Sequence, residues 1–147
     1  MADQPASVLF ACSQNSVRSP MAEAIAKHHF GKRIYFDSVG VRAEEIDPFA
    51  VAVMEGIGID LHRHHPKTFD DLQDSSFDLV VTLSPEAQHS AVEMTRTMAC
   101  DVEYWPTADA TAVEGSREAR LGAYRAVRDR LVERIVARFG ARPAPKV

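Results

Sequence analysis

Cysteine is scarce in this chain of 147 residues, where only Cys12 and Cys100 occur. Two cysteines are too few for the disulfide framework of a small secreted protein, and they suit a reducing compartment. Long apolar runs are also missing, because no stretch approaches the ~18 residues that span a bilayer. The N-terminus has neither the basic region nor the apolar region of a signal peptide. The sequence therefore predicts a cytoplasmic protein with no membrane partner.

Positive charge is in short supply as well. Lysine and arginine number 17 against 21 aspartate and glutamate residues, so the formal net charge is -4. Nucleic-acid binders usually carry a basic field, so a nucleic-acid partner is not expected, and an anionic substrate would need a local positive site. With 46% hydrophobic and 26% charged residues, the composition is that of one folded domain. We expect this domain to span residues 1–147, with a frayed tail at about 141–147, as a monomer or weak dimer.

Short apolar runs alternate with amphipathic segments along the chain. This alternation predicts an α/β fold with right-handed crossovers, in which helices flank both faces of a mostly parallel sheet. The expected fold is a single three-layer domain with four parallel strands in the order 2-1-3-4. The predicted strands are 7–11, 34–38, 77–83 and 102–105, and the predicted helices begin near Pro20, Asp47, Ser84 and Ser116. Ligands of such sheets bind at the carboxyl ends of the strands, which is where Cys12 falls.

The segment from Cys12 to Arg18 joins the first predicted strand to the first predicted helix, with five residues between the cysteine and the arginine. A loop of this length can turn successive backbone N–H groups toward one anion, and the helix N-terminus adds positive potential that favours a thiolate. The guanidinium of Arg18 can donate two parallel hydrogen bonds to an oxyanion, and Ser19 can donate a proton to the sulfur. Asn15 suits a left-handed turn within the loop. The pattern predicts an oxyanion site with Cys12 as nucleophile.

The sequence here resembles the low-molecular-weight protein tyrosine phosphatase superfamily, which includes the thioredoxin-linked arsenate reductases. That superfamily carries C-x-G-N-x-C-R-S-P near its nucleophile. This chain keeps Cys12, Asn15, Arg18 and Ser19-Pro20 in register, but has Gln14 for the glycine and Val17 for the second cysteine. The resemblance extends to Asp37-Ser38-Val39-Gly40, Asp47-Pro48 to Asp60, Asp78 to Leu83, and Trp105 through Asp109 to Asp129. It implies that Cys12 and Arg18 are catalytic and that the substrate is bound by Ser13, Gln14, Asn15, Ser16, Val17 and Ser19.

The resemblance also implies a general acid on a late loop, and Asp109 lies where that acid belongs. Asp109 would protonate the leaving oxygen and then activate water against a phosphocysteine. The family's usual Asp-Pro pair is replaced by Asp109-Ala110, and the aromatic residues that often follow the acid are missing. We therefore expect a more mobile acid loop.

Three functions fit these residues. The first is hydrolysis of a phosphomonoester, from a phosphorylated protein or a small aryl phosphate, without a metal or organic cofactor. The second is reduction of arsenate, but the resemblance places the resolving thiols of that reaction at Ser84 and Ala91, where no thiol is present. An external thiol would be needed, or Cys100 with its Cα within ~7 Å of that of Cys12. The third is an oxyanion-binding regulatory module with low activity. Hydrolysis is the function we favour.

The sequence predicts structural roles for several other residues. Adjacent His62, His64 and His65 are expected to face solvent and not to bind a metal, because no carboxylate or cysteine at ligand spacing completes a shell. Asp70, Asp71 and Asp74 are expected to be helix-start and surface charges. Glu23 and Ser38 match positions that support the loop or a cation in some reductases, and packing is the role expected here. The last helix is expected to cover the core and not to bind a partner.

Overall fold

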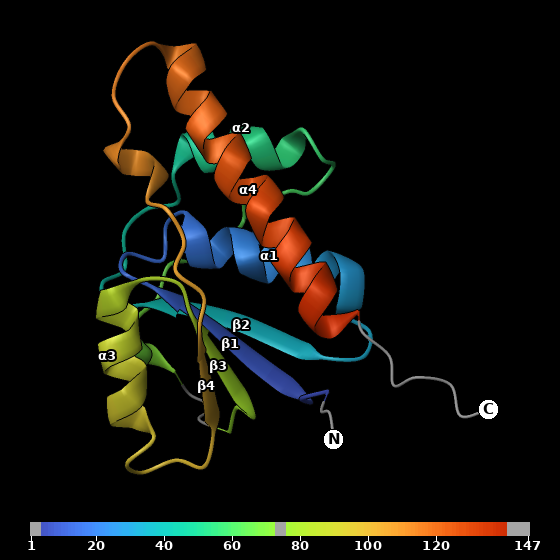
Figure 1. Ribbon diagram of the computed structural model, residues 1–147, viewed down its shortest axis with the longest axis vertical. Coiled ribbons are helices and arrows are strands. Elements are labelled where there is room, and N and C mark those ends of the chain that lie inside the picture. Colours follow the sequence, from blue (N-terminus) through green and yellow to red (C-terminus); the bar gives the residue numbers. More distant parts are fainter. Residues whose placement is uncertain (1–3, 73–75, 141–147) are drawn as a thin grey trace, which may run out of the picture.

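The computed structural model describes residues 4–72 and 76–140, and its centre is a sheet of four parallel strands (Figure 1). The strands are β1 (Ser7–Cys12), β2 (Tyr35–Gly40), β3 (Leu79–Thr82) and β4 (Asp101–Tyr104). They lie in the order β2-β1-β3-β4, and every neighbouring pair is parallel. The predicted strand order is confirmed.

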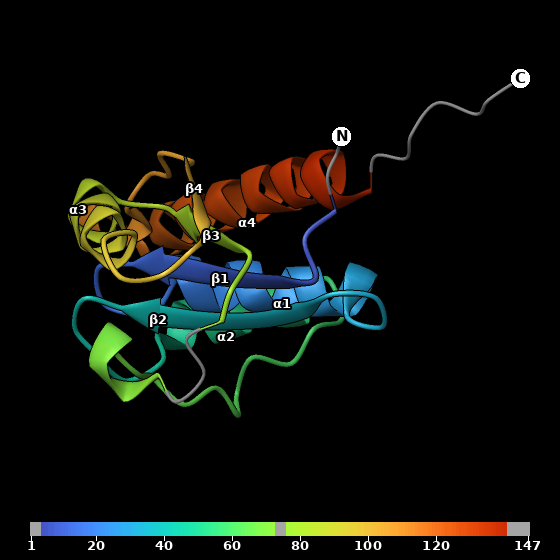
Figure 2. The ribbon, with the colours of Figure 1, turned by 90° about the horizontal axis from the view of Figure 1, so that it is seen from below.

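Helices cover both faces of this sheet, which makes three layers (Figure 2). One face carries α1 (Arg18–Phe30), α2 (Pro48–Glu55) and α4 (Arg117–Phe139), and the other carries α3 (Pro85–Met94). Two short 3-10 helices, η1 (Phe69–Asp71) and η2 (Ala110–Ala112), lie in the connections. The predicted α/β class is therefore confirmed. Asp70 and Asp71 belong to η1, whereas Asp74 and the tail 141–147 fall outside the described residues.

The alternation of side chains along β1 divides the core in two. Val8, Phe10 and Cys12 pack into the cluster beneath α1 and α4, and Leu9 and Ala11 pack into the cluster beneath α3. Both faces of β1 are buried, which explains why its sequence is a continuous apolar run without polar residues between. Cys12 is thus the last residue of a strand that the core holds on both sides.

The starts of α2, α3 and α4 follow the capping signals in the sequence, whereas α1 begins at Arg18 without a side-chain cap. The side chains of Asp47, Ser84 and Ser116 accept hydrogen bonds from backbone N–H groups in the first turns of α2, α3 and α4. A proline stands at the first position of α2 and of α3, where its missing N–H costs nothing. No helix in the described part of the chain is long and apolar enough to cross a membrane.

The loop after β1 lies where the two crossover directions of the sheet diverge. The chain leaves β1 through α1 to reach β2 on one side, and β3 joins β1 on the other side. Such a switch point leaves an open crevice at the carboxyl ends of the strands. The segment 12–18, which we call the phosphate loop, occupies this position.

Candidate active site

The phosphate loop is tied down through its carbonyl groups. The carbonyls of Cys12, Ser13 and Gln14 accept hydrogen bonds from the N–H groups of Val41, Arg42 and Glu44 at 3.0, 2.8 and 3.0 Å. The carbonyl of Ser16 accepts one from Asp47 at 3.1 Å. With the carbonyls bound on the outside of the loop, the N–H groups are left for its inner side.

Two of these N–H groups point at the sulfur of Cys12. Those of Asn15 and Ser19 lie 3.3 and 3.4 Å from Sγ, and Cys12 is only 2% exposed. The N–H groups of Gln14, Ser16 and Val17 have no acceptor among the described residues. Converging backbone donors beside a helix N-terminus form a site for an anion, either the thiolate itself or a tetrahedral oxyanion above it.

Ser19 couples the sulfur to the core of the loop. Its Oγ lies 2.9 Å from Sγ of Cys12 and 3.1 Å from the carbonyl oxygen of Val39, and it has one proton to donate. When the sulfur is a thiolate, the hydroxyl donates to it. When the sulfur carries a proton, the thiol can donate to Oγ while the hydroxyl donates to Val39. The predicted role of Ser19 as a donor to the sulfur thus has the geometry that it needs.

Asn15 holds the loop from within. Its φ of 53° is the left-handed conformation that the sequence predicted, and the residue is fully buried. Its Nδ2 donates to the hydroxyl groups of Ser19 and Ser38 at 2.9 and 3.1 Å. Its Oδ1 accepts from the backbone N–H of Lys67 at 2.9 Å and from Nε2 of His64 at 3.0 Å. All four bonding positions of the amide are filled, so its side chain is fixed.

The contact with His64 corrects the expectation that the three histidines face solvent. The His64 side chain is only 8% exposed, and burial lowers its pKa from the ordinary value, although the charge of Glu23 acts in the opposite direction. Glu23 and Ser38 also do more than pack, because Ser38 Oγ donates to Glu23 Oε1 at 2.6 Å. These three residues form the support beneath Asn15. His62 and His65 are exposed, as expected.

Gly40, at the end of β2, allows the loop to approach closely. A Cβ atom at this position would lie 2.6 Å from the backbone nitrogen of Asn15 and would also collide with the carbonyl oxygen of Arg42. Both neighbours are backbone atoms, so neither can turn aside as a flexible side chain would. The loop keeps its form only with glycine at this position.

Arg18 connects the phosphate loop to the segment 105–113, which we call the acid loop. The residue is 7% exposed, and its Nη1 donates to the carbonyl oxygen of Thr107 at 3.1 Å. Thr107 is anchored in turn by a backbone bond to Leu83 at 3.1 Å. The guanidinium therefore reaches from the first turn of α1 to within two residues of Asp109. This contact places the catalytic candidates Arg18 and Asp109 close to each other.

Asp109 itself is exposed and lightly held. Its Oδ1 accepts from the backbone N–H and the Oγ1 of Thr111 at 3.0 and 2.6 Å, as the cap of η2. Tyr124 lies within its electrostatic reach. Burial, a hydrogen bond to Asp47 at 2.7 Å, and the charges of Asp47 and Asp109 raise the pKa of Tyr124. Because Asp47 also binds the carbonyl of Ser16, Tyr124 links α4 to the phosphate loop.

The second cysteine lies far from the first. Strand register aligns Val8 with Leu79 and Leu79 with Asp101, so Cys100 lies level with Ser7, five residues before Cys12. At ~3.3 Å per residue the separation along the strands is ~16 Å, well beyond the ~7 Å that a disulfide allows between Cα atoms. Cys100 packs beneath α3, on the other face of the sheet from Cys12, and burial raises its pKa. A disulfide between them is incompatible with this fold.

Ser84, the position of a resolving thiol in the related reductases, does lie beside the phosphate loop. Its hydroxyl accepts a hydrogen bond from Ser13 Oγ at 3.1 Å and caps α3. Ala91 lies within α3 and is buried on the face that packs against the sheet. The remaining loop positions differ in exposure, since Ser13 and Gln14 are half-buried, whereas Ser16 and Val17 are buried. The Val17 side chain packs into the core, so only its backbone is available to a ligand.

Sequence reasoning missed the residues that hold the loop from outside it. His64, Lys67, Tyr124 and Gly40 gave no local signal of this role, because each meets the loop only through the tertiary fold. Glu86 is another, since its charge lies near Ser13 and Arg18, and its bond to Arg42 lowers its pKa. The adjacent histidines were visible in the sequence, but their pattern suggested only a surface cluster.

Comparisons with known proteins agree with this geometry. The sequence matches the family of the low molecular weight phosphotyrosine protein phosphatases over residues 7–139. The arsenate reductase of Bacillus licheniformis is 34% identical over 128 residues, which cover 87% of this chain and 91% of that protein. A solved arsenate reductase in the phosphate binding state has a TM-score of 0.68 at 26% identity and covers 91% of this chain and 96% of its own.

A tyrosine phosphatase of Erwinia amylovora has a TM-score of 0.74 over 95% of this chain and 94% of its own. At 18% identity it shows a shared fold only. The family match, in contrast, runs from β1 to the end of α4 and includes all three catalytic candidates, Cys12, Arg18 and Asp109. The chain therefore belongs to the low-molecular-weight phosphotyrosine protein phosphatase family, whose phosphatases and arsenate reductases are enzymes.

Proposed function

We propose that this protein hydrolyses phosphomonoesters through a phosphocysteine on Cys12. The observation that carries the proposal is that no second thiol lies near the Cys12 sulfur, in a site that has the other groups needed for phosphoryl transfer. Cys12, Arg18 and Asp109 suffice for hydrolysis, whereas arsenate reduction needs a second thiol, and Cys100 lies ~16 Å away along the strands. A phosphorylated protein or a small aryl phosphate is the proposed substrate class.

In the first step, Cys12 Sγ attacks phosphorus and the bond from phosphorus to the ester oxygen breaks. The N–H groups of the phosphate loop and the guanidinium of Arg18 stabilise the charge on the equatorial oxygens. Asp109 gives its proton to the leaving oxygen, so that an alcohol or phenol departs instead of its anion. The sulfur is no longer negatively charged once it is bonded to phosphorus, and the N–H groups that had faced it donate to the phosphoryl group.

In the second step, Asp109 accepts a proton from water, whose oxygen attacks phosphorus. The bond between sulfur and phosphorus breaks, inorganic phosphate leaves, and the thiolate returns to the donors from Asn15 and Ser19. The hydroxyl of Ser19, 2.9 Å from Sγ, donates to the departing thiolate. No atom in either step is supplied by a metal or an organic cofactor.

Arsenate reduction is the second candidate, and the names of the similar proteins favour it. The relatives from Bacillus licheniformis and Bacillus subtilis, at 34% and 32% identity, are both arsenate reductases. In this chain, Cys12 Sγ would attack arsenic and displace one oxygen of arsenate as water. A small-molecule thiol would then attack the Cys12 sulfur, the bond between sulfur and arsenic would break with its electron pair going to arsenic, and arsenite would leave. The mixed disulfide that remains on Cys12 would be reduced by a further thiol.

A parallel assay on p-nitrophenyl phosphate and arsenate separates the two functions. We expect hydrolysis of the aryl phosphate that is abolished in Cys12→Ser and reduced about 100-fold or more in Asp109→Ala. Arsenate should compete as an inhibitor without being reduced when glutathione or thioredoxin is present. Thiol-dependent arsenite formation without aryl phosphate turnover would overturn the proposal in favour of reduction. If the protein binds phosphate but catalyses neither reaction, the proposal fails and the protein is an oxyanion-binding module.

A further inference from the structure

A groove lies between α4 and the edge strand β4, outside the catalytic residues. It has a volume of about 440 Å³ and is lined by Glu103 and Trp105 from the β4 side and by residues of α4. A second hollow of about 350 Å³ lies between the acid loop and α4, and Asp109 is among its lining residues. Arg130 lines both hollows, so the two lie next to each other on a path that leads from the acid loop along α4.

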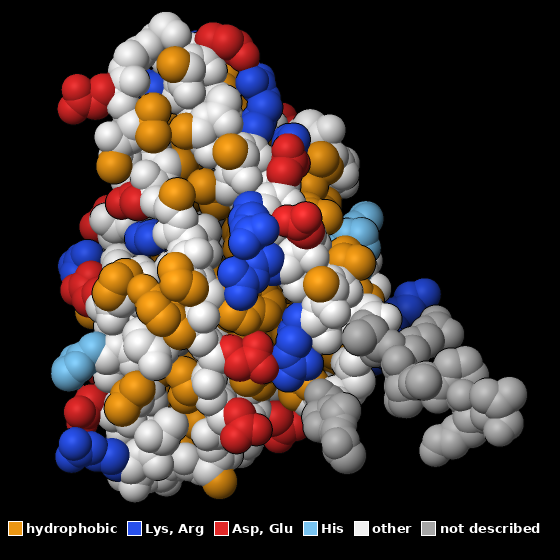
Figure 3. Space-filling model, viewed as in Figure 1, with side chains coloured by type: hydrophobic (Ala, Val, Ile, Leu, Met, Phe, Trp, Pro, Cys, Tyr) orange, Lys and Arg blue, Asp and Glu red, His pale blue; other side chains and the backbone are white. Residues whose placement is uncertain are grey.

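Three arginines form a row along this path. Arg130, Arg134 and Arg138 follow one another at intervals of four residues, which places them on one face of α4. Figure 3 shows lysine and arginine side chains gathered along the middle of this face of the molecule, beside apolar side chains. The row extends over ~12 Å of helix, the length of about four residues of extended chain. Two carboxylates, those of Glu103 and Glu133, line the same groove, so its three arginines leave an excess of positive charge in a protein with a net charge of -4.

The arginines keep much of their bonding capacity. Arg134 has no carboxylate partner among the described residues, and its guanidinium lies 5.1 Å from the centre of the Trp105 ring. Arg130 binds Glu133 through Nη1 only, and Arg138 binds Glu103 through Nε only. Since a guanidinium has five N–H donors, each arginine can donate hydrogen bonds to a further carboxylate.

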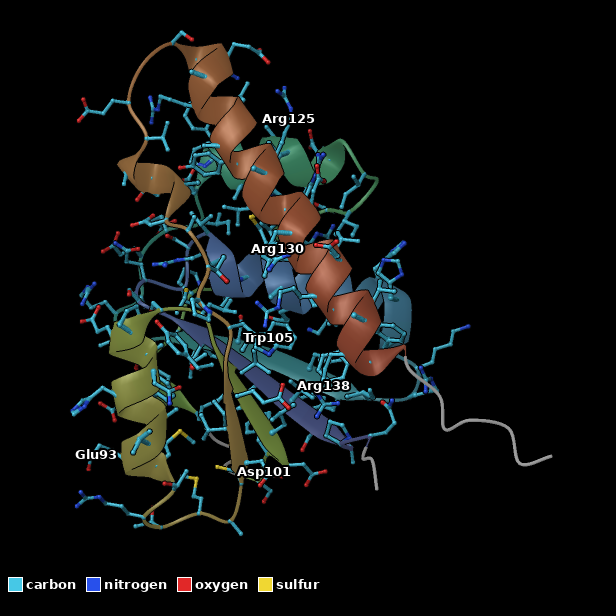
Figure 4. All side chains as sticks on the ribbon, viewed as in Figure 1. Glu93, Asp101, Trp105, Arg125, Arg130 and Arg138 are labelled. Carbon is cyan, nitrogen blue, oxygen red and sulfur yellow. The ribbon has the colours of Figure 1, made fainter. Side chains whose placement is uncertain are left out.

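Trp105 and Glu103 form the other wall of the groove. Glu103 Oε1 accepts hydrogen bonds from Trp105 Nε1 at 3.1 Å and from Arg138 Nε at 3.3 Å, which fixes the ring against α4. Figure 4 shows Trp105 beside the helix with Arg130 and Arg138, whereas Arg125 lies nearer the start of α4. Beyond β4 no further strand is present in the described sheet, so the groove is open along its side.

From these observations we propose that the groove docks an extended acidic segment of a phosphorylated protein substrate. This inference rests on the proposed phosphatase function and names its substrate class. Carboxylates of the segment pair with the arginine row, and the phosphorylated residue reaches Cys12 past the acid loop. The apolar face of α4 covers the core, as the sequence predicted, and its outer face gives the helix this second role.

Matched phosphotyrosine peptides test the proposal. One carries four glutamates before the phosphotyrosine, one carries them after it, and one carries four glutamines instead. We expect one of the two acidic peptides to exceed the neutral peptide in kcat/KM by up to about fivefold for each carboxylate that pairs with an arginine. This preference should shrink at 0.5 M salt, because exposed charges are then screened.

Two charge reversals on the same helix locate the effect. Arg134→Glu should abolish the preference for the acidic peptide, and the hydrolysis of p-nitrophenyl phosphate should stay within twofold of wild type. Arg125→Glu makes the same change of net charge outside the groove and should retain the preference. Equal loss in both variants, or no preference in the wild type, would overturn the proposal.

A binding measurement separates this inference from the proposed function. Trp105 is the only tryptophan of the chain, so its fluorescence reports on the groove. An unphosphorylated acidic peptide should change the emission of the wild type and of Arg125→Glu, but not of Arg134→Glu. If aryl phosphate is not hydrolysed and this binding persists, the docking surface stands and the phosphatase function fails. If hydrolysis occurs without this binding, the docking surface is wrong.

Discussion

Asn15 and Asp109 show how differently the two sides of the active site are held. Asn15 is fully buried, and its side chain makes four hydrogen bonds to Ser19, Ser38, His64 and Lys67. Asp109 is exposed, and its carboxylate bonds only to Thr111 among the described residues. The phosphate loop is thus fixed before any ligand arrives, whereas the acid loop can adjust. In the proposed phosphatase, a rigid cradle would suit the phosphoryl group that all substrates share, and an adjustable acid would suit leaving groups that differ.

The largest effect should come from breaking the rigid side. Gly40→Ala places a methyl group against the backbone of Asn15, so the phosphate loop must move. We expect kcat/KM for p-nitrophenyl phosphate to fall at least ~100-fold, since small misplacements of catalytic groups cost this much. The control is Gly122→Ala in α4, where nothing lies within 4 Å, and it should raise stability by ~0.5–1 kcal/mol. Unchanged activity in Gly40→Ala would show that the loop is not held as described.

The second prediction concerns the stability of the protein at low pH. Because burial lowers the pKa of His64, the folded protein holds its imidazole neutral. The stability from this neutral histidine is complete above the unfolded pKa of ~6.5 and is lost as the pH falls below it. His64→Gln retains an amide donor for Asn15 but does not titrate. Urea unfolding measures the free energy of unfolding at pH 7.5 and 5.5, and this free energy should fall less between the two pH values in His64→Gln than in the wild type. In His65→Gln, at an exposed position, it should fall as in the wild type.

A third prediction tests the lightly held side. Thr111→Val removes the hydroxyl that bonds to Asp109 Oδ1 at 2.6 Å. One hydrogen bond contributes ~1 kcal/mol net, so we expect kcat to fall about fivefold while competitive inhibition by phosphate stays unchanged. Thr95→Val, at an exposed position in α3's C-terminal turn, is the control. A matching loss of phosphate binding would mean that the two loops are coupled and not independent.

The smallest effect should come from stiffening the acid loop. Ala110→Pro restores the family's usual Asp-Pro pair at the first position of η2, where the extended conformation of Asp109 accommodates a following proline. We expect a gain in stability of ~0.4–1 kcal/mol and a kcat change of no more than about twofold for an aryl phosphate. Thermal unfolding and steady-state kinetics measure both quantities. A large fall in kcat would show that the acid loop needs its freedom.

The sequence was sufficient for the parts of this protein that depend on local chemistry. Alternating apolar runs and helix caps such as Asp47-Pro48 predicted the order of elements. An asparagine at position 15 predicted the left-handed backbone conformation found there. Contacts between distant segments were not accessible in the same way. Nothing local to His64 indicates that its Nε2 lies 3.0 Å from Oδ1 of Asn15, 49 positions earlier, so the sequence alone predicts an exposed position for it.

The distance between the two cysteines also bears on how this protein meets oxidants. Peroxide would convert Cys12 to a sulfenic acid, and with Cys100 out of reach and Val17 in place of a neighbouring thiol, the chain has no second thiol of its own to trap it. Recovery therefore depends on thiols from outside. The activity in a cell would then rise and fall with its supply of small reducing thiols, which makes redox balance a condition of function.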